Sequence, residues 1–297
     1  MEGGGLHKEV TVQGEFEQQI VAAKTGEEFY SISDPQAQRE YVEVRTAAKW
    51  VGFFLPHLRS GMSLLDCGCG MGSITLDLAE IVAPGQVVGI DVDAGQLEGA
   101  RSLAHRRGVA NVHFEVASVY DLPFPAASFD AALVHTLLIH LSDPLRALKE
   151  IRRILKPGGI VAVSDDDYST VVFSPASPFL QKLIALWVGI LQSNGGNPFY
   201  SRHLRHMLLE SGYVRTEGYA VAVDYYGNLA EIQRYSRVME RLLSEPALGE
   251  LIIKHGLADQ ASLDAMIVEM RSWAQKPDAF LAWMYCAALG WVAEETS

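Results

Sequence analysis

Three glycines at alternate positions follow a short apolar run, and this loop carries the clearest chemistry in the chain. The run Leu64–Asp66 leads into Gly68, Gly70 and Gly72, and Asp91 closes the next apolar run nineteen residues after Gly72. Glycines permit a tight turn and let backbone amides approach a ligand closely. A carboxylate at the end of the second run can accept hydrogen bonds from both hydroxyls of a ribose. The spacing therefore predicts a site for a cofactor that carries a nucleoside.

Two other classes of glycine-rich loop that bind nucleotides have different sequence patterns. A nicotinamide or flavin site usually has the pattern GxGxxG, and its third glycine would fall at Ser73. The phosphate-binding pattern GxxxxGK[ST] is absent from the sequence. The loop therefore does not belong to either class.

An alternation of strand-like and helical segments must position this loop. The strand-like runs are 63–66, 87–91, 112–116, 131–135 and 160–164, and the helical segments between them are 74–82, 94–107 and 144–155. Short apolar strands that alternate with helices indicate a parallel sheet covered on both faces. Two further strands are expected within 213–225. We expect an α/β fold with a doubly wound, mostly parallel, seven-stranded sheet.

The remaining segments do not follow this repeat. We expect helices over 36–58, 180–191, 201–210 and most of 229–294. The predicted organisation is an N-terminal segment (1–44) that could fold over the cofactor, a cofactor-binding domain (45–225) and a C-terminal helical extension (226–297). An insertion at about 168–200 is a candidate substrate cap. The added helices either complete the core or cap the site, and both interpretations stay open.

Composition limits the classes of partner. The chain has 297 residues, of which 49% are hydrophobic, and a net charge of −12. This charge disfavours nucleic acid and anionic membranes, both of which require a basic surface. Because no basic and apolar leader is visible, we expect a cytoplasmic protein. We also expect it to be either a monomer or a homodimer. The three cysteines, Cys67, Cys69 and Cys286, lack a metal-binding spacing, and no metal is predicted.

Further motifs appear downstream of the loop in a characteristic order. They are Asp66–Gly72, Val87–Asp91, Asp121–Pro125, Ser128–Asp130, His140–Pro144 and Arg153–Gly159. Together they resemble the UbiE/COQ5-like branch (methyltransferase domain 11) of the class I S-adenosylmethionine (SAM)-dependent methyltransferases, over roughly residues 45–225. The resemblance implies a Rossmann-like fold that binds SAM and releases S-adenosylhomocysteine (SAH).

The resemblance also implies roles for individual residues. Asp66 would open the loop, the three glycines would approach the methionine part of SAM, and Asp91 would hold the ribose. The other implied cofactor-binding residues are Val92 and Gln96 beside the ribose and adenine, Ser118 and Val119 after the third strand, His135 and Thr136 after the fourth, and Arg45. Ser118 stands where the family often has an acidic residue. Arg45 could pair with the SAM carboxylate or could be a surface charge.

Methyl transfer needs a base only when the acceptor is protonated. The candidates are His135, His140, Asp166 and Tyr30. His140 could instead be a packing residue. Asp166 belongs to the acidic run 165–167, which could bind Mg²⁺ or an amine or could form a solvated turn. The C-terminal aromatic residues at 273–291 are expected to belong to the core, and a role in lining a substrate pocket stays open as the alternative.

The predicted function is SAM-dependent methyl transfer to a small molecule, with O, N or C as the accepting atom, in a pathway such as secondary metabolism. Two alternatives stay open. One is a cyclase or isomerase that binds SAM without transferring its methyl group. The other is a non-catalytic SAM-binding subunit, although neither Gly68, Gly70 nor Asp91 is lost here.

Overall fold

The computed structural model describes residues 45–224 and 228–295. Tyr30 and the N-terminal segment 1–44 lie outside the described residues, so the predictions for them stay predictions. None of the helices in the described part of the chain is long and apolar enough to cross a bilayer.

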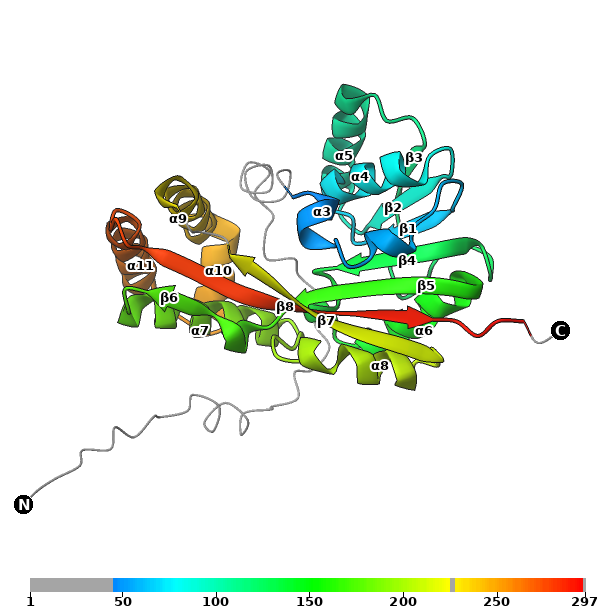
Figure 1. Ribbon diagram of the computed structural model, residues 1–297. Helices are drawn as coiled ribbons and strands as arrows, with labels where there is room; N and C mark the ends of the chain where they lie inside the picture. Colours follow the sequence, from blue (N-terminus) through cyan, green and yellow to red (C-terminus); the bar gives the residue numbers. More distant parts are fainter. Residues whose placement is uncertain (1–44, 225–227, 296–297) are drawn as a thin grey trace, which may run out of the picture.

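A single mixed sheet forms the centre of the molecule (Figure 1). Its strands are β1 (Leu64–Cys67), β2 (Val87–Asp91), β3 (Val112–Val116), β4 (Phe129–His135), β5 (Leu155–Asp166), β6 (Val172–Ser174), β7 (Arg215–Asp224) and β8 (Phe280–Trp291). The order is β3-β2-β1-β4-β5-β8-β6, and β7 also pairs with β8. Strands β1 to β5 are parallel, whereas β8 is antiparallel to β5, β6 and β7. The predicted α/β, mostly parallel sheet is confirmed, with the short β6 as an additional strand.

Helices cover the sheet and extend beyond it. They are α3 (Ala47–Trp50), α4 (Ser73–Val82), α5 (Ala94–Arg107), α6 (Pro144–Ile154), α7 (Pro178–Ser193), α8 (Leu204–Glu210), α9 (Leu229–Leu243), α10 (Pro246–Lys254) and α11 (Gln260–Trp273), with short 3₁₀ turns η1 (Leu55–His57), η2 (Leu138–His140), η3 (Tyr168–Thr170) and η4 (Ser201–His203). Figure 1 shows α7, α9, α10 and α11 gathered around the start of β8, away from α4 and α5.

Local sequence explains where the helices next to the site begin and end. Asp93 caps α5 by accepting from the backbone N–H groups of Gly95 and Gln96. Gly108 ends the same helix in the left-handed conformation, at φ 68°. Asp143 caps α6, with Pro144 in its first turn. These signals place α5 and α6 within a residue of the predicted ranges.

The two faces of β5 pack against different parts of the molecule. Ile160 and Ala162 belong to a core cluster that includes side chains of α7, α9 and α11. Val161 and Val163 belong to a second cluster, with side chains of α6 and α8. Successive residues of a strand point to opposite faces, so the same alternation decides where the polar end of β5 points.

Three expectations about secondary structure were wrong. The predicted C-terminal helical extension (226–297) ends in a twelve-residue strand, β8, because a continuous apolar run has no period that separates a strand from a buried helix. Residues 213–225 contain one strand, β7, which pairs along its whole length with β8. In the described part of 36–58, α3 and η1 are separate turns rather than one helix. The predicted helix at 201–210 is confirmed as η4 followed by α8.

Candidate functional site

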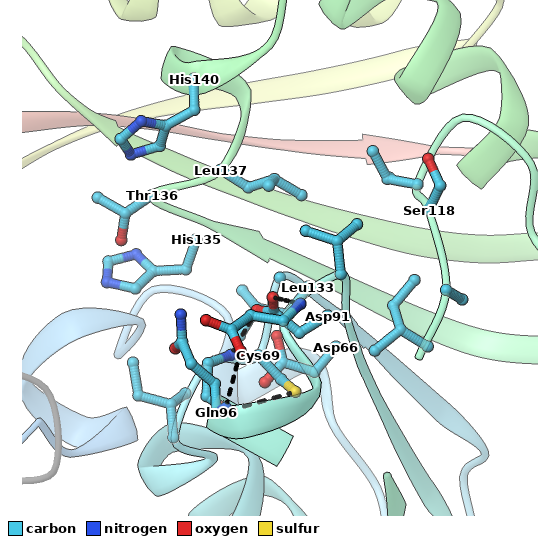
Figure 2. A pocket seen from close by; sticks show the side chains of 18 of the residues that line it. Asp66, Cys69, Asp91, Gln96, Ser118, Leu133, His135, Thr136, Leu137 and His140 are labelled. Carbon is cyan, nitrogen blue, oxygen red and sulfur yellow. Dashed lines mark hydrogen bonds between the residues drawn. The ribbon is translucent and has the colours of Figure 1, made fainter. Parts of the chain in front are cut away.

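A pocket lies at the carboxyl ends of β1, β2 and β4, where open parallel sheets bind ligands (Figure 2). Its space is about 1160 Å³, open mouth included. The predicted cofactor residues that line it are Arg45, Asp66, Gly68, Gly70, Asp91, Val92, Gln96, Ser118, Val119, His135 and Thr136. In Figure 2, Asp66, Asp91 and Gln96 lie together on one side, and Ser118 comes from a loop on the other.

The glycine loop needs its glycines for two different reasons. Gly70 has a φ of 53°, and a Cβ at this position would lie 2.8 Å from the side-chain oxygen of Gln96. Gly70 therefore keeps the wall of the pocket free of side chains. Gly72 is not among the pocket-lining residues: a Cβ there would lie 2.9 Å from Phe114 and 3.0 Å from Ala100. The structure thus gives Gly72 a packing role, and its approach to the ligand stays a prediction.

Asp91 ends β2 beside the loop. One carboxylate oxygen accepts from the backbone N–H of Gly70 at 3.0 Å, and the other accepts from that of Asp93 at 3.0 Å. Burial raises the pKa of Asp91, and these two hydrogen bonds oppose the rise. Each carboxylate oxygen has two lone pairs, so both can still accept from a ligand.

Asp66 lies under the loop and is buried. It accepts from the hydroxyl of Thr75 at 2.6 Å. Burial raises its pKa to about 7, although the hydrogen bond from Thr75 opposes this effect. A cationic group in the pocket would favour the ionised form of Asp66.

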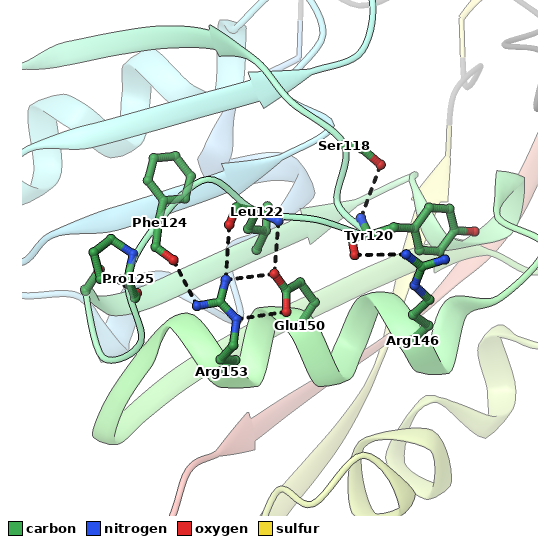
Figure 3. A network of polar contacts seen from close by, with 9 residues as sticks. Ser118, Tyr120, Leu122, Phe124, Pro125, Arg146, Glu150 and Arg153 are labelled. Carbon is green, nitrogen blue, oxygen red and sulfur yellow. Dashed lines mark hydrogen bonds and ion pairs between the residues drawn. The ribbon is translucent and has the colours of Figure 1, made fainter.

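The loop after β3 is fastened to α6 (Figure 3). Arg153 donates to the backbone carbonyls of Leu122 at 3.1 Å and Phe124 at 2.9 Å. Glu150 accepts from the backbone N–H of Leu122 at 3.0 Å and pairs with Arg153. The guanidinium of Arg146 lies over the ring of Tyr120. These contacts fix the loop that carries Ser118 and Val119 into the pocket.

Arg45, His135 and Thr136 form the opposite end of the pocket. Thr136 has a φ of 53°, which is rare for a β-branched residue, and it accepts from Arg45 at 3.1 Å. Arg45 is 9% exposed and lies over the ring of Trp50, so it is not a surface charge. The His135 ring packs against the rings of Trp50 and Tyr285, which also contact each other. Its burial and the charge of Arg45 hold the pKa of His135 well below its ordinary value.

A second pocket adjoins the first and shares Arg45, Thr136 and His140 with it. Its space is about 1000 Å³, open mouth included. The wall is mostly apolar, and its apolar and aromatic members are Ile139, Val171, Leu180, Leu183, Ile184, Trp187, Leu191, Tyr235, Met239, Leu242, Leu281 and Trp283. The polar side chains are few and include Asp166 and Tyr168. Apolar pockets with few polar groups are typical binding sites for small organic molecules.

The acidic run at the end of β5 is not a solvated turn. Asp165 and Asp167 are 0% and 1% exposed, and Asp166 lies between them on the wall of the second pocket. Among the described residues, no group of three His, Cys, Asp or Glu side chains could hold a metal ion.

The structure therefore brings three of the four candidate bases together, because His135, His140 and Asp166 all line the two pockets. The sequence reasoning missed Trp50, whose ring packs against His135, and the contribution of Trp283 to the second pocket. The C-terminal aromatic residues divide between both predicted roles: Trp273 is buried in the core, whereas Trp283 lines a pocket. The high density of aromatic residues at 273–291 was the available sequence signal for a pocket wall, but it did not indicate which of these residues face the site.

Comparisons with known proteins agree with this geometry. Residues 65–163 match the methyltransferase domain family (Methyltransf_11). An uncharacterised methyltransferase of Schizosaccharomyces pombe is 30% identical over 57% of this chain and 63% of its own length. A probable methyltransferase of Aspergillus luteorubrus, ltbC, is 27% identical over 85% of this chain and 93% of its own length. The demethylmenaquinone methyltransferase of Lactococcus lactis is 36% identical over 42% of this chain and 54% of its own length. The chain thus spans between about half and nearly all of these relatives.

Two solved structures share the fold. The YcgJ protein of Bacillus subtilis has a TM-score of 0.54 at 21% identity, over 82% of this chain and 98% of that one. The [4+2]-cyclase SpnF has a TM-score of 0.51 at 24% identity, over 90% of this chain and 86% of that one. At these identities the likeness shows the fold alone.

The fold, the glycine loop and the family match together identify residues 65–163 as a methyltransferase domain of the class I SAM-dependent type, whose cofactor is SAM. The resemblance to the UbiE/COQ5-like branch is confirmed. The residues present fit the cofactor: Gly70 lines the pocket with backbone alone, and Asp91 keeps acceptor capacity on both oxygens.

Proposed function

We propose that this chain transfers the methyl group of SAM to a small molecule whose apolar body lies in the second pocket. The observation that carries the proposal is that this apolar pocket adjoins the cofactor pocket and shares Arg45, Thr136 and His140 with it. An acceptor there would lie beside Thr136, one of the cofactor-binding residues that the resemblance implies after the fourth strand. The relatives named as methyltransferases support the reaction class.

Different residues of the first pocket would bind different parts of the cofactor. Asp91 would accept from the ribose hydroxyls, and Val92 and Gln96 would flank the ribose and adenine. Ser118 and Val119 would contact the adenine from the loop fastened to α6. Asp66 and Arg45 carry the charges that suit the ammonium and carboxylate groups of a methionine moiety.

Bound SAM supplies an electrophilic methyl group for an in-line displacement. The protein would contribute mainly by positioning, which accounts for a large part of the rate in such reactions. The second pocket would align the acceptor through apolar contacts with α7, α9 and β8 and would exclude water. The cap role predicted for residues 168–200 fits this arrangement, because α7 forms much of the wall.

The first experiment is calorimetric titration with SAM and SAH. Micromolar binding is expected, and Asp91→Ala should weaken it by about 1.5–3 kcal/mol, the range for hydrogen bonds to a charged group. Glu98→Ala removes an exposed carboxylate from the neighbouring helix and should bind like the wild type. Absence of SAM and SAH binding by the folded protein would refute the proposal.

The acceptor is then sought by product mass, because a methyltransferase product gains one methyl group whereas a cyclase or isomerase product keeps its mass. Ile184→Trp would fill the second pocket, and Ala185→Trp, at the adjacent exposed position, is its control. Turnover should fall at least about ten-fold in Ile184→Trp alone, with SAM affinity unchanged. Equal turnover in both variants would show that the acceptor binds elsewhere.

A further inference from the structure

The end of β5 presents one carboxylate to the acceptor pocket and fastens two others to the opposite side. We propose that Asp166 accepts the proton of a hydroxyl group on an aromatic acceptor, so that the activated oxygen receives the methyl group. This inference rests on the proposed function and adds to it the class of acceptor and the residue that activates it.

Strand alternation separates the three consecutive acids. Asp165 follows Val161 and Val163 to one face of β5, where it accepts from the hydroxyl of Tyr200 at 2.6 Å. Asp167 accepts from two nitrogens of Arg202, at 2.8 and 2.9 Å. Asp166 follows Ile160 and Ala162 to the other face, on the side of α7 and α9.

Both neighbours therefore anchor the backbone that carries Asp166. Tyr200 and Arg202 come from η4 and the residue before it, so each contact ties the strand end to the same segment. A carboxylate that must meet a reacting atom needs such a fixed backbone, since small displacements cost large factors in rate. In this interpretation Asp165 and Asp167 anchor the backbone, Asp166 is the one carboxylate that faces the pocket, and the three acids do not form a metal-binding cluster.

The surroundings of Asp166 suit proton acceptance. The indole N–H of Trp283 donates to one of its oxygens at 2.8 Å, which orients the carboxylate and leaves further acceptor capacity. Burial raises the pKa of Asp166, while hydrogen bonds from Tyr285 and Trp283 and the charge of Arg45 oppose the rise. A carboxylate with a raised pKa is a stronger base than an exposed one, and Arg45 favours its ionised form.

The remaining lining indicates the shape of the acceptor. Trp187, Tyr235 and Trp283 contribute flat aromatic surface, and the other wall residues are mostly aliphatic. Polar groups gather where the two pockets join, at Arg45, Thr136 and His140, close to Asp166. Such a pocket matches a ring system with a hydroxyl at one end.

His135 is a weaker candidate for this step. Of the two pockets it lines only the first, it packs against two aromatic rings, and its pKa is lowered. In the proposed step the O–H bond of the acceptor breaks and its proton passes to Asp166. The acceptor oxygen bonds to the methyl carbon as the methyl–sulfur bond breaks, and the electron pair of that bond stays on sulfur.

The test compares 2-naphthol with its methyl ether, 2-methoxynaphthalene, in which one added methyl group removes the hydrogen-bond donor; both are titrated by fluorescence into the full chain saturated with SAH. The wild type should bind 2-naphthol at least about ten-fold more tightly. Asp166→Asn should lose most of this preference with SAH affinity unchanged. Asp278→Asn, an exposed carboxylate just before β8, should keep the preference.

Turnover of 2-naphthol with SAM, followed by product mass, gives the second readout. Asp166→Asn should lower kcat by about 10²–10⁴-fold. Equal affinity of the wild type for the two probes, binding of neither probe, or full turnover by Asp166→Asn would overturn the inference. Each of these results would leave the proposed function standing as long as SAM binds, whereas loss of SAM binding by the wild type refutes the proposed function itself.

Discussion

Gly70 and Gln96 lie next to each other on the wall of the cofactor pocket, where an added methyl group would contact Gln96. In Gly70→Ala, the added Cβ would lie 2.8 Å from the Gln96 oxygen, and the residue would keep a φ of 53°. We expect SAM affinity to fall about ten-fold, because the added Cβ would displace the Gln96 side chain, which is expected beside the ribose and adenine. Calorimetric titration measures this effect.

Gly256→Ala is the matched control for backbone strain. Gly256 has a φ of 67° and nothing within 4 Å of the added Cβ. Both variants should lose about 1–2 kcal/mol of unfolding free energy from the left-handed backbone. Only Gly70→Ala should lose SAM affinity, and equal affinity in the two variants would remove Gly70 from the cofactor site.

Asp66 should make stability depend on pH. Its pKa rises from 3.8 unfolded to about 7 folded, so between these values the folded state binds one more proton than the unfolded state. Stability from this group therefore falls as pH rises through the window and is level above it. Relative to the wild type, Asp66→Asn should gain about 2 kcal/mol between about pH 5 and pH 7. Urea unfolding without SAM measures the difference.

Asp130→Asn is the control for this prediction, because the pKa of Asp130 is lowered where that of Asp66 is raised. Burial would raise the pKa of Asp130, but hydrogen bonds from Lys156 and Ser63 outweigh it and hold the pKa below 3.8. Both folded and unfolded states are then ionised above about pH 5, so the effect of Asp130→Asn should not vary over the same range. A parallel pH dependence in both variants would contradict the burial argument for Asp66.

At the scale of elements, α6 holds the loop that brings Ser118 and Val119 to the cofactor. Arg153→Met removes the bonds to the carbonyls of Leu122 and Phe124 and the pair with Glu150. We expect faster amide hydrogen exchange over residues 118–124 and SAM affinity about three- to ten-fold lower. Lys149→Met removes an exposed positive charge from the same helix and should change neither. Unchanged exchange in Arg153→Met would show that the loop holds its own shape.

At the scale of the whole molecule, β8 joins the helices around α7 to the rest of the sheet. It pairs with β5, β6 and β7 and carries the buried Tyr285 and Leu289. A chain that ends after Ala279 should therefore lose cooperative unfolding and SAM binding. A chain that ends after Glu294 keeps β8 and should behave as the full chain does. Circular dichroism during heating measures both, and cooperative unfolding of the shorter chain would show that the SAM-binding part folds without β8.

Sequence reasoning was most successful for the first βαβ unit. The strands around Asp66 and Asp91 and the helix α5 follow the expected ranges, because their signals are an apolar run, a glycine turn and a capping residue within a few positions. The same reasoning failed at β8, whose apolar run suits a buried helix as well as a strand. Only the pairing partners β5 and β7 resolve that ambiguity.

The sequence by itself determined the kind of cofactor. The glycine loop and Asp91 lie close together in the chain and predict a nucleoside-bearing ligand, and the motifs downstream carry the resemblance that implies SAM. Tertiary structure alone decided the second pocket, where we propose that the acceptor binds. Arg45, Thr136, Asp166 and Trp283 span most of the chain and meet only through the order of strands in the sheet. No local sequence pattern predicts that these four residues lie close together, because their proximity depends on which face each strand presents once β8 has paired with β5.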